Sequence, residues 1–310
     1  MVLTPLRTAL PMSPRVWLDL GRMKHHTDGP EPITSVPAHY EAMTDSMLKY
    51  GGGELLACHF GLWEAETKSG PEALRHSNRT LVEGCDLGPG RRVLDAGCGV
   101  GGTAIALAET CGAHVTGLTN CEPHVAVATE QAKRRGVGHL VEFHHGDFMY
   151  LPFPNACFDA VVNHEAFCYA PDKLAYLRGV FRVLKPGGRW QALEGLLSGE
   201  PLSEADEATH TRMQWGFRMP PLVSWRDVLA TLEKAGFEGI REQDLTSKVS
   251  PYTERVRKFW SLYSFVTPIP SGPERAYHEF MEAAIAFDQG LREGVFTYRF
   301  VSGAKPNQAF

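Results

Sequence analysis

Short apolar runs alternate with amphipathic stretches along the chain from residue 91 onward. The apolar runs cover residues 92–95, 114–118, 141–144, 158–162 and 189–194, and helical periodicity marks residues 103–111, 122–135 and 172–183. Strands that alternate with helices in this way are typical of a parallel sheet, because parallel neighbours need a crossover connection. The pattern therefore predicts an α/β fold with five parallel strands.

The C-terminal half repeats this rhythm with two interruptions. Residues 225–235, Gly236 and residues 237–244 read as a helix, a glycine stop and a strand. Residues 198–224 and 248–290 are richer in aromatic side chains and less sheet-like, so we expect both to be lid insertions over the core. Residues 295–301 alternate with period two, which predicts an edge strand with one solvent-exposed face.

The first 90 residues are harder to interpret. Helical patches at 38–49 and 71–83 are separated by three glycines at 51–53 and by the aromatic run at 59–63. We expect residues 1–90 to form an N-terminal helical arm and substrate cover, with the core in residues 91–310. The N-terminus has no apolar signal region, and no stretch approaches the roughly 18 apolar residues of a membrane span. We therefore expect a cytoplasmic protein without a membrane span.

Composition narrows the class of partner. Hydrophobic residues make up 43% of the chain and charged residues 22%, which is typical of a globular protein, and the net charge is −5. This balance lacks the clustered Lys and Arg that nucleic acids require, so a small-molecule substrate is favoured. The seven cysteines form no C-x-x-C pair, and neither His25-His26 nor His144-His145 has zinc-ligand spacing, so we expect no metal site built from these residues. The sequence leaves open whether the protein forms a homo-oligomer.

A glycine-rich turn follows the first apolar run. Asp95 ends that run, and Gly97, Gly99, Gly101 and Gly102 precede the next helical stretch. Glycine permits a tight turn there and lets a ligand approach the backbone closely. Such a turn is weak evidence by itself, because it also occurs in dinucleotide sites and in simple chain reversals.

The surrounding residues favour one interpretation. The run 93–99 resembles the motif with which class I methyltransferases bind S-adenosylmethionine (SAM), and Asp147, Pro152-Phe153 and residues 185–188 match that family's order and spacing. The resemblance implies a Rossmann-like sheet, mostly parallel with an antiparallel last strand, and helical lid insertions. It also implies that SAM is the cofactor. The residues that it assigns to cofactor binding are Asp95, Gly97, Gly99, Gly101, Thr119, Asn120, Asp147, Phe148 and Asn163.

Individual roles follow from the same resemblance. The turn 97–101 would hold the methionine end of SAM, Asp147 would accept a hydrogen bond from the adenine amine beside Phe148, and Asn163 would lie near the methionine amino group. The second strand departs from the family, because it ends in Thr119 and Asn120 where an acid usually binds the ribose. Glu122 is a possible substitute for that acid.

Three further segments narrow the resemblance. Residues 146–153, 158–161 and 165–172 are similar to the sterol 24-C-methyltransferase group, and residues 58–63 are similar to its N-terminal aromatic segment. Gly51 to Gly53 and Leu55-Leu56 replace some of the aromatics expected there. The chain looks closer to the microbial branch that includes geranyl diphosphate 2-C-methyltransferase. A prenyl diphosphate is then the first substrate to consider, with a prenylated aromatic or polycyclic terpenoid as alternatives.

Methylation of an alkene places particular requirements on an active site. A C=C bond needs no base before methyl transfer, but it needs alignment with the methyl group and shelter for the carbocation that forms. Aromatic faces attract cations without reacting, although any one of them can equally be core packing. We expect Glu165 to remove the final proton, with His164 or His59 as alternative bases. The candidate aromatic residues are Phe60, Trp63, Phe167, Tyr169, Trp215 and Phe217.

Other functions remain open at this stage. A diphosphate head group would need basic donors, with Mg²⁺ if the substrate is a diphosphate, and the predicted lid supplies candidates. An N- or O-methyltransferase of a small metabolite would need a base beside a heteroatom, and a SAM-binding protein without catalysis is a third possibility. The basic candidates are Arg212, Arg218, Arg255, Arg257 and Lys258.

Overall fold

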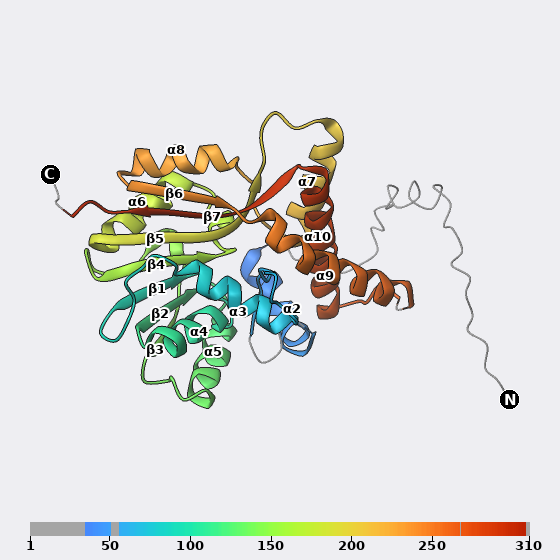
Figure 1. Ribbon diagram of the computed structural model, residues 1–310. Coiled ribbons are helices and arrows are strands. Elements are labelled where there is room, and N and C mark those ends of the chain that lie inside the picture. The colour runs from blue at the N-terminus through green and yellow to red at the C-terminus, as the bar shows by residue number, and fades with distance from the viewer. Residues whose placement is uncertain (1–34, 51–55, 267, 308–310) are drawn as a thin grey trace. The chain divides into compact units, whose positions relative to one another are not determined.

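The computed structural model describes residues 35–50, 56–266 and 268–307. Within this part of the chain, seven strands form one sheet in the order β3-β2-β1-β4-β5-β7-β6 (Figure 1). Strands β1 to β5 run parallel to one another, and β7 pairs antiparallel with both β5 and β6. The predicted mostly parallel sheet with an antiparallel last strand is confirmed. The strands are β1 (Arg92–Ala96), β2 (His114–Thr119), β3 (Val141–His145), β4 (Phe158–His164), β5 (Leu184–Leu197), β6 (Glu238–Asp244) and β7 (Phe296–Ala304).

Helices cover both faces of the sheet. Successive strand residues point to opposite faces, so Val93 joins one apolar cluster and Leu94 joins the other. The first cluster lies among α4, α5 and the lid helices, and the second lies under α6 and α8 (Figure 1). The helices are α2 (Val36–Tyr50), α3 (Gly70–Leu81), α4 (Gly102–Cys111), α5 (Glu122–Arg134), α6 (Lys173–Val183), α7 (Glu204–Phe217), α8 (Trp225–Ala235), α9 (Thr246–Val266) and α10 (Pro273–Glu293), with short 3₁₀ turns η2 (Phe148–Tyr150) and η3 (Phe167–Tyr169).

Local sequence signals explain several helix boundaries. The Asp172 side chain accepts a hydrogen bond from the backbone N–H of Ala175 and so starts α6. Ser203 and Asp206 form a capping box at the start of α7. Gly236 ends α8 with φ +95°, a left-handed conformation that glycine adopts without a steric cost.

The prediction that residues 295–301 form an edge strand was wrong. Strand β7 lies between β5 and β6, and it is buried along almost its whole length, whereas β6 is the exposed edge. The alternating polar residues mislead because Thr297 is buried and Arg299 is held by ion pairs to Glu242 and Asp244 of β6. A polar position on this strand thus faces a neighbouring side chain instead of solvent.

The two predicted lid insertions contain helices. Residues 198–224 contain α7, and residues 248–290 contain most of α9 and α10. Helix α10 packs against α7, α9 and α2 at the end of the sheet where β7 begins (Figure 1). Residues 1–34 and 51–55 of the predicted N-terminal arm, including the glycine run and Leu55, lie outside the described residues.

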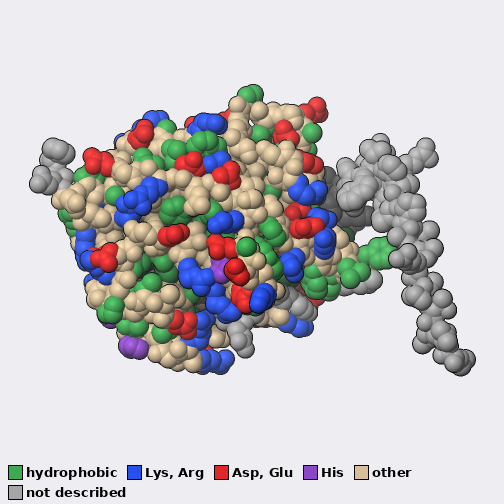
Figure 2. Space-filling model, viewed as in Figure 1, with side chains coloured by type: hydrophobic (Ala, Val, Ile, Leu, Met, Phe, Trp, Pro, Cys, Tyr) green, Lys and Arg blue, Asp and Glu red, His purple; other side chains and the backbone are tan. Residues whose placement is uncertain are grey.

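Lys and Arg side chains are interspersed with Asp and Glu over the face seen in Figure 2. No helix among the described residues is both long and apolar enough to cross a membrane.

Candidate active site

Two neighbouring cavities lie beyond the carboxyl ends of strands β1, β2 and β4. The turn cavity, of about 440 Å³, is bordered by the glycine-rich turn after β1 and by the ends of β2 and β4. The aromatic cavity, of about 360 Å³, is bordered by the turn after β4 and by helices α7, α9 and α10. Both cavities are lined by Tyr40, Cys58, His59, Glu165 and Tyr169. These shared residues form a common wall.

The glycine-rich turn leaves space for a ligand in the turn cavity. Gly97 and Gly99 have φ angles of +100° and +51°, and both line this cavity. A Cβ at Gly97 would lie 2.5 Å from Cβ of Ala166, whereas a Cβ at Gly99 would meet no atom within 4 Å and would project into open space. Gly97 therefore permits close packing of two turns, and Gly99 keeps a cradle open for the ligand.

Asp95 offers an unused acceptor at the base of this cradle. Its side chain is 1% exposed, and Oδ2 has no hydrogen-bond partner among the described residues. Burial raises the pKa of this carboxyl to about 7. A buried acceptor without a partner is costly unless a ligand supplies a donor, and a ligand ammonium group would satisfy it and favour its charged form. The turn cavity thus fits the amino acid end of SAM.

Four more predicted cofactor residues line the turn cavity. Thr119 and Asn120 stand at the end of β2, and Asp147 and Phe148 stand on the turn after β3. Asp147 accepts a hydrogen bond from the backbone N–H of Met149 at 2.8 Å through Oδ1, and its exposed side chain leaves Oδ2 available. Glu122, the possible ribose acid, begins α5 and does not line this cavity.

Two predicted cofactor residues lie elsewhere. Gly101 is the N-cap residue of α4, and a Cβ there would lie 2.7 Å from Cβ of Ala128, so this glycine serves helix packing. Asn163 is completely buried beneath the site. Its Nδ2 donates to Ala96 O at 2.6 Å, and its Oδ1 accepts from Tyr176 and Trp190, each at 2.7 Å. Asn163 therefore braces β4 against β1 and does not reach the turn cavity.

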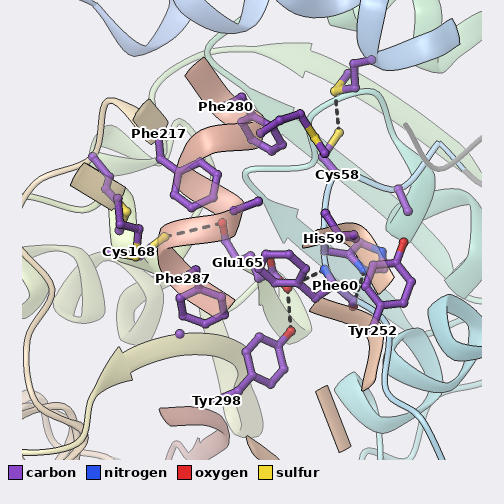
Figure 3. A pocket seen from close by; sticks show the side chains of 18 of the residues that line it. Cys58, His59, Phe60, Glu165, Cys168, Phe217, Tyr252, Phe280, Phe287 and Tyr298 are labelled. Carbon is purple, nitrogen blue, oxygen red and sulfur yellow. Dashed lines mark hydrogen bonds between the residues drawn. The ribbon is translucent and has the colours of Figure 1, made fainter. Parts of the chain in front are cut away.

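Aromatic and thioether side chains surround the second cavity (Figure 3). The Phe60 and Phe287 rings stack with centroids 5.2 Å apart, and the Phe217 and Phe280 rings meet edge to face at 4.9 Å. The predicted residues Phe60, Tyr169 and Phe217 all contribute to this lining. The chain thereby assembles several ring faces around one space, which suits a hydrocarbon substrate and a cationic intermediate.

Three predicted aromatic residues do not line the aromatic cavity. Trp215 is 51% exposed, and the Arg218 guanidinium lies 4.3 Å from its ring centroid. Residues two positions apart on an α-helix point in directions about 200° apart, so Trp215 and Phe217 cannot share a face of α7. Phe217 is the one that faces the cavity. Phe167 is buried in the core of the other sheet face, and Trp63 stacks with Arg255.

Glu165 occupies the common wall with an unusual backbone conformation. It follows β4 directly with φ +52°, a region that non-glycine residues rarely adopt and that often marks functional sites. Its Oε1 accepts from the Phe60 backbone N–H and from the Tyr298 hydroxyl, each at 2.7 Å (Figure 3). Burial raises the pKa of this carboxyl to about 8, against the lowering effect of the two donors.

The two histidines beside Glu165 are held neutral. The His59 and His164 rings stack at 3.5 Å, and the Thr103 hydroxyl lies 3.1 Å from Nδ1 of His164. Burial lowers the pKa of His59 to about 4 and that of His164 well below its usual value. A group whose conjugate acid is this strong is a weak base at neutral pH, so Glu165 is better suited to accept a proton.

Sequence reasoning missed three residues of this site. Glu194 of β5 accepts from the backbone N–H groups of Ala166 and Phe167 at 2.9 and 2.6 Å, and Tyr298 donates to Glu165. The hydroxyls of Tyr40 and Tyr169 lie 2.8 Å apart and join α2 to the turn after β4. An isolated Glu inside the apolar run of β5 was the available signal, because a buried carboxylate needs donors.

The basic lid residues mostly have partners already. Arg218 pairs with Glu279, Arg257 with Asp288 and Lys258 with Glu254, while Arg212 donates to Gln289. Only Arg255 of the five candidates lines the aromatic cavity. The described residues include no group of three or more His, Cys, Asp or Glu side chains arranged to hold a metal ion.

The chain is similar in sequence to known proteins over most of its length. Residues 94–190 match the family described as "Methyltransferase domain". The chain is 31% identical over 290 residues to cycloartenol-C-24-methyltransferase of Arabidopsis thaliana, covering 85% of this chain and 84% of that relative. It is 33% identical over 214 residues to sterol 24-C-methyltransferase erg6 of Aspergillus fumigatus, covering 68% of this chain and 55% of that protein.

Two solved structures share the fold. The [4+2]-cyclase SpnF superposes with a TM-score of 0.73 at 25% identity, covering 89% of this chain and 96% of its own. Geranyl diphosphate C-methyltransferase from Streptomyces coelicolor superposes with a TM-score of 0.68 at 20% identity, covering 86% and 98%. The fold and cofactor cradle define a SAM-dependent methyltransferase of class I. The chain belongs to the sterol 24-C-methyltransferase family.

Proposed function

We propose that this enzyme transfers the methyl group of SAM to an electron-rich C=C bond of an isoprenoid, and that Glu165 removes a proton from the resulting carbocation. The observation that carries the proposal is the position of Glu165, which lines both the turn cavity and the aromatic cavity. When bound, SAM supplies an electrophilic methyl group on a positively charged sulfur. After methyl transfer the substrate cation must lose a proton, and a base on the wall between cofactor and substrate is in position to accept it.

The reaction needs no base before the methyl group moves. The π electrons of the alkene form the new C–CH₃ bond while the S–CH₃ bond breaks, and the positive charge passes to a substrate carbon. Ring faces of Phe60, Phe217 and Phe287 surround the space where this charge develops. Their quadrupoles stabilise a cation, and the absence of nucleophilic atoms on them prevents capture.

Glu165 then completes the reaction. Its carboxylate takes the proton from a carbon next to the cation, and the C–H electrons form the new C=C bond. The raised pKa, about 8, makes this carboxylate a stronger base than an exposed glutamate. Glu165 would be held in its ionised form before transfer by a cofactor sulfonium bound in the adjacent turn cavity, since an opposite charge lowers a carboxyl pKa.

The cavity favours an uncharged substrate over a diphosphate. Four of the five basic candidates are already bonded to Glu, Asp or Gln side chains, and the fifth, Arg255, stacks on Trp63. A diphosphate carries several negative charges and would need more free donors than one guanidinium. A sterol, polycyclic terpenoid or prenylated aromatic with an isolated alkene therefore suits this cavity better.

Product mass spectrometry tests the proposal. The enzyme is incubated with SAM and separately with a sterol that has a side-chain alkene, a prenylated indole, geranyl diphosphate and farnesyl diphosphate. The expected result is a gain of one methylene unit on a carbon skeleton of an uncharged substrate. Methylation of heteroatoms alone would contradict it and favour an N- or O-methyltransferase. An isomeric product without mass gain would instead indicate a cyclase, the activity that the name of SpnF carries.

A further inference from the structure

Glu194 is a buried carboxylate that contacts the turn carrying Glu165. Its side chain is 1% exposed and rises from β5 beside the aromatic cavity. Oε1 accepts from the N–H groups of Ala166 and Phe167, and Oε2 accepts from that of Cys168 at 3.4 Å. Three successive backbone N–H groups thus converge on one carboxylate, an arrangement that binds anions well.

The rest of the turn is tied to the same place. The N–H of Glu165 donates to the Leu193 carbonyl at 2.9 Å. The Lys173 ammonium donates to the carbonyls of Cys168 and Ala170 at 2.8 and 2.6 Å, and its charge favours the ionised form of Glu194. Every described N–H from residue 165 to residue 168 is therefore held by β5 or its side chain.

This support matters because the backbone of Glu165 is unfavourable by itself. A φ of +52° costs a non-glycine residue on the order of 1 kcal/mol or more, so the surrounding bonds must hold it. The left-handed conformation is what turns the Glu165 side chain toward the Phe60 N–H and the Tyr298 hydroxyl (Figure 3). Without the bonds from β5, the turn would relax and the carboxylate would leave the wall.

We propose that Glu194 is a positioning residue: by binding the N–H groups of residues 166–168, it holds Glu165 at the boundary between the cofactor and the substrate. This inference rests on the proposed function in that it takes Glu165 as the base. Glu194 also acts through its charge, because a second carboxylate nearby opposes ionisation of the first.

Glu194 is the charged neighbour that acts on Glu165, because the other titratable groups around Glu165 are uncharged. Burial raises the pKa of each neighbouring hydroxyl and thiol and lowers that of each neighbouring histidine, so all of them are uncharged at neutral pH. Lys173 is the cation that acts on Glu194. The uncharged neighbours are Tyr40 from α2, Cys58 and His59 from the segment before α3, His164 from β4, Cys168 and Tyr169 from η3, Tyr252 from α9 and Tyr298 from β7.

The variants Glu194→Gln and Glu194→Ala separate charge from positioning. Gln keeps an acceptor for Ala166 and Phe167 but removes the charge, so the acid limb of kcat/KM should move to lower pH by on the order of one unit. Ala removes all three bonds, so kcat should fall about 100-fold with a smaller change in KM. Gln191→Ala is the matched control, because Gln191 is a buried polar residue on β5 that bonds to Glu83 away from this turn. It should lower the melting temperature without moving the acid limb.

A direct titration keeps this test independent of turnover. Carboxyl ¹³C NMR of Glu-labelled enzyme, with the Glu165 signal assigned by Glu165→Gln, should show a lower Glu165 pKa in Glu194→Gln than in the wild type. An unchanged titration together with an unchanged acid limb and kcat in folded Glu194 variants would overturn the proposal. If the wild type methylates no alkene but the titration shifts, the effect of the Glu194 charge on Glu165 stands and the proposed function fails.

Discussion

The hydroxyl of Tyr298 lies 2.7 Å from Oε1 of Glu165 and joins the antiparallel strand β7 to the turn after β4. Both side chains line the aromatic cavity, although they are 133 residues apart in the sequence. The hydrogen bond stabilises the ionised carboxyl, since a donor to the charged form lowers its pKa. Placement of β7 inside the sheet is what brings Tyr298 to the site.

Tyr298→Phe should therefore move the acid limb of kcat to higher pH. The variant removes one of two donors to Oε1, so the Glu165 pKa rises above about 8 and a smaller fraction of the base is ionised at neutral pH. The rate at pH 7 should fall by about tenfold and recover in part at pH 9. Tyr252→Phe is the control, because this tyrosine lines the same cavity without a hydrogen bond to Glu165. A Tyr298→Phe profile that coincides with the wild type would contradict the assigned role of this bond.

Two glycines of the cofactor turn should respond differently to alanine. At Gly97 the new Cβ would overlap Ala166, so Gly97→Ala should lower the free energy of unfolding by roughly 2 kcal/mol or more. The same variant should also weaken cofactor binding. At Gly99 the new methyl group meets open cavity, so Gly99→Ala should cost about 1 kcal/mol of stability and mainly weaken binding of S-adenosylhomocysteine. Calorimetric titration and denaturant unfolding measure the two effects. Equal losses of stability in both variants would argue against a cradle at Gly99.

Asp95 should make the ligand-free protein less stable as the pH rises. The pKa of Asp95 is about 7 in the folded protein, against its ordinary value of 3.8. Between these pH values the folded state therefore retains a proton that the unfolded chain loses. The contribution is complete below about pH 4 and is lost as the pH rises through 7. Asp95→Asn should therefore gain stability relative to the wild type by roughly 2 to 3 kcal/mol between pH 5 and pH 8, while binding S-adenosylhomocysteine much more weakly.

Urea unfolding of both ligand-free proteins at pH 5 and pH 8 checks this prediction. A constant difference between them at the two pH values would show that Asp95 does not titrate in this range. Undiminished cofactor affinity in Asp95→Asn would contradict the assignment of its free oxygen to the ligand.

The two aromatic residues near the end of α7 provide a matched pair. Phe217 lines the aromatic cavity, whereas Trp215 is half exposed on the opposite face. Phe217→Ala should lower kcat/KM for the substrate at least about tenfold more than Trp215→Ala, because it removes a ring from the space where the cation forms. Steady-state kinetics at one pH are sufficient, and the reverse order would place the substrate elsewhere.

Local patterns were enough to predict the sheet and the cofactor turn. The apolar runs and glycine stops identify the strands, and Asp95 to Gly99 identify the cradle, because these features depend on neighbouring residues in the sequence. The register of β7 and the contacts of Glu194 depend on long-range pairing, which no local pattern contains. The side-chain contacts of Asn163 depend on the same long-range pairing, since only the fold brings Tyr176 and Trp190 to its amide.

Isotope-labelled methyl transfer by the wild type and Glu165→Gln tests the central claim most directly. With SAM that carries a CD₃ group and an accepted alkene substrate, the wild type should give a methylated, deprotonated product. Glu165→Gln should bind S-adenosylhomocysteine with similar affinity but form that product at least about 100-fold more slowly, because the proton has no acceptor. An undiminished rate and an identical product from Glu165→Gln would contradict the assignment of Glu165 as the base.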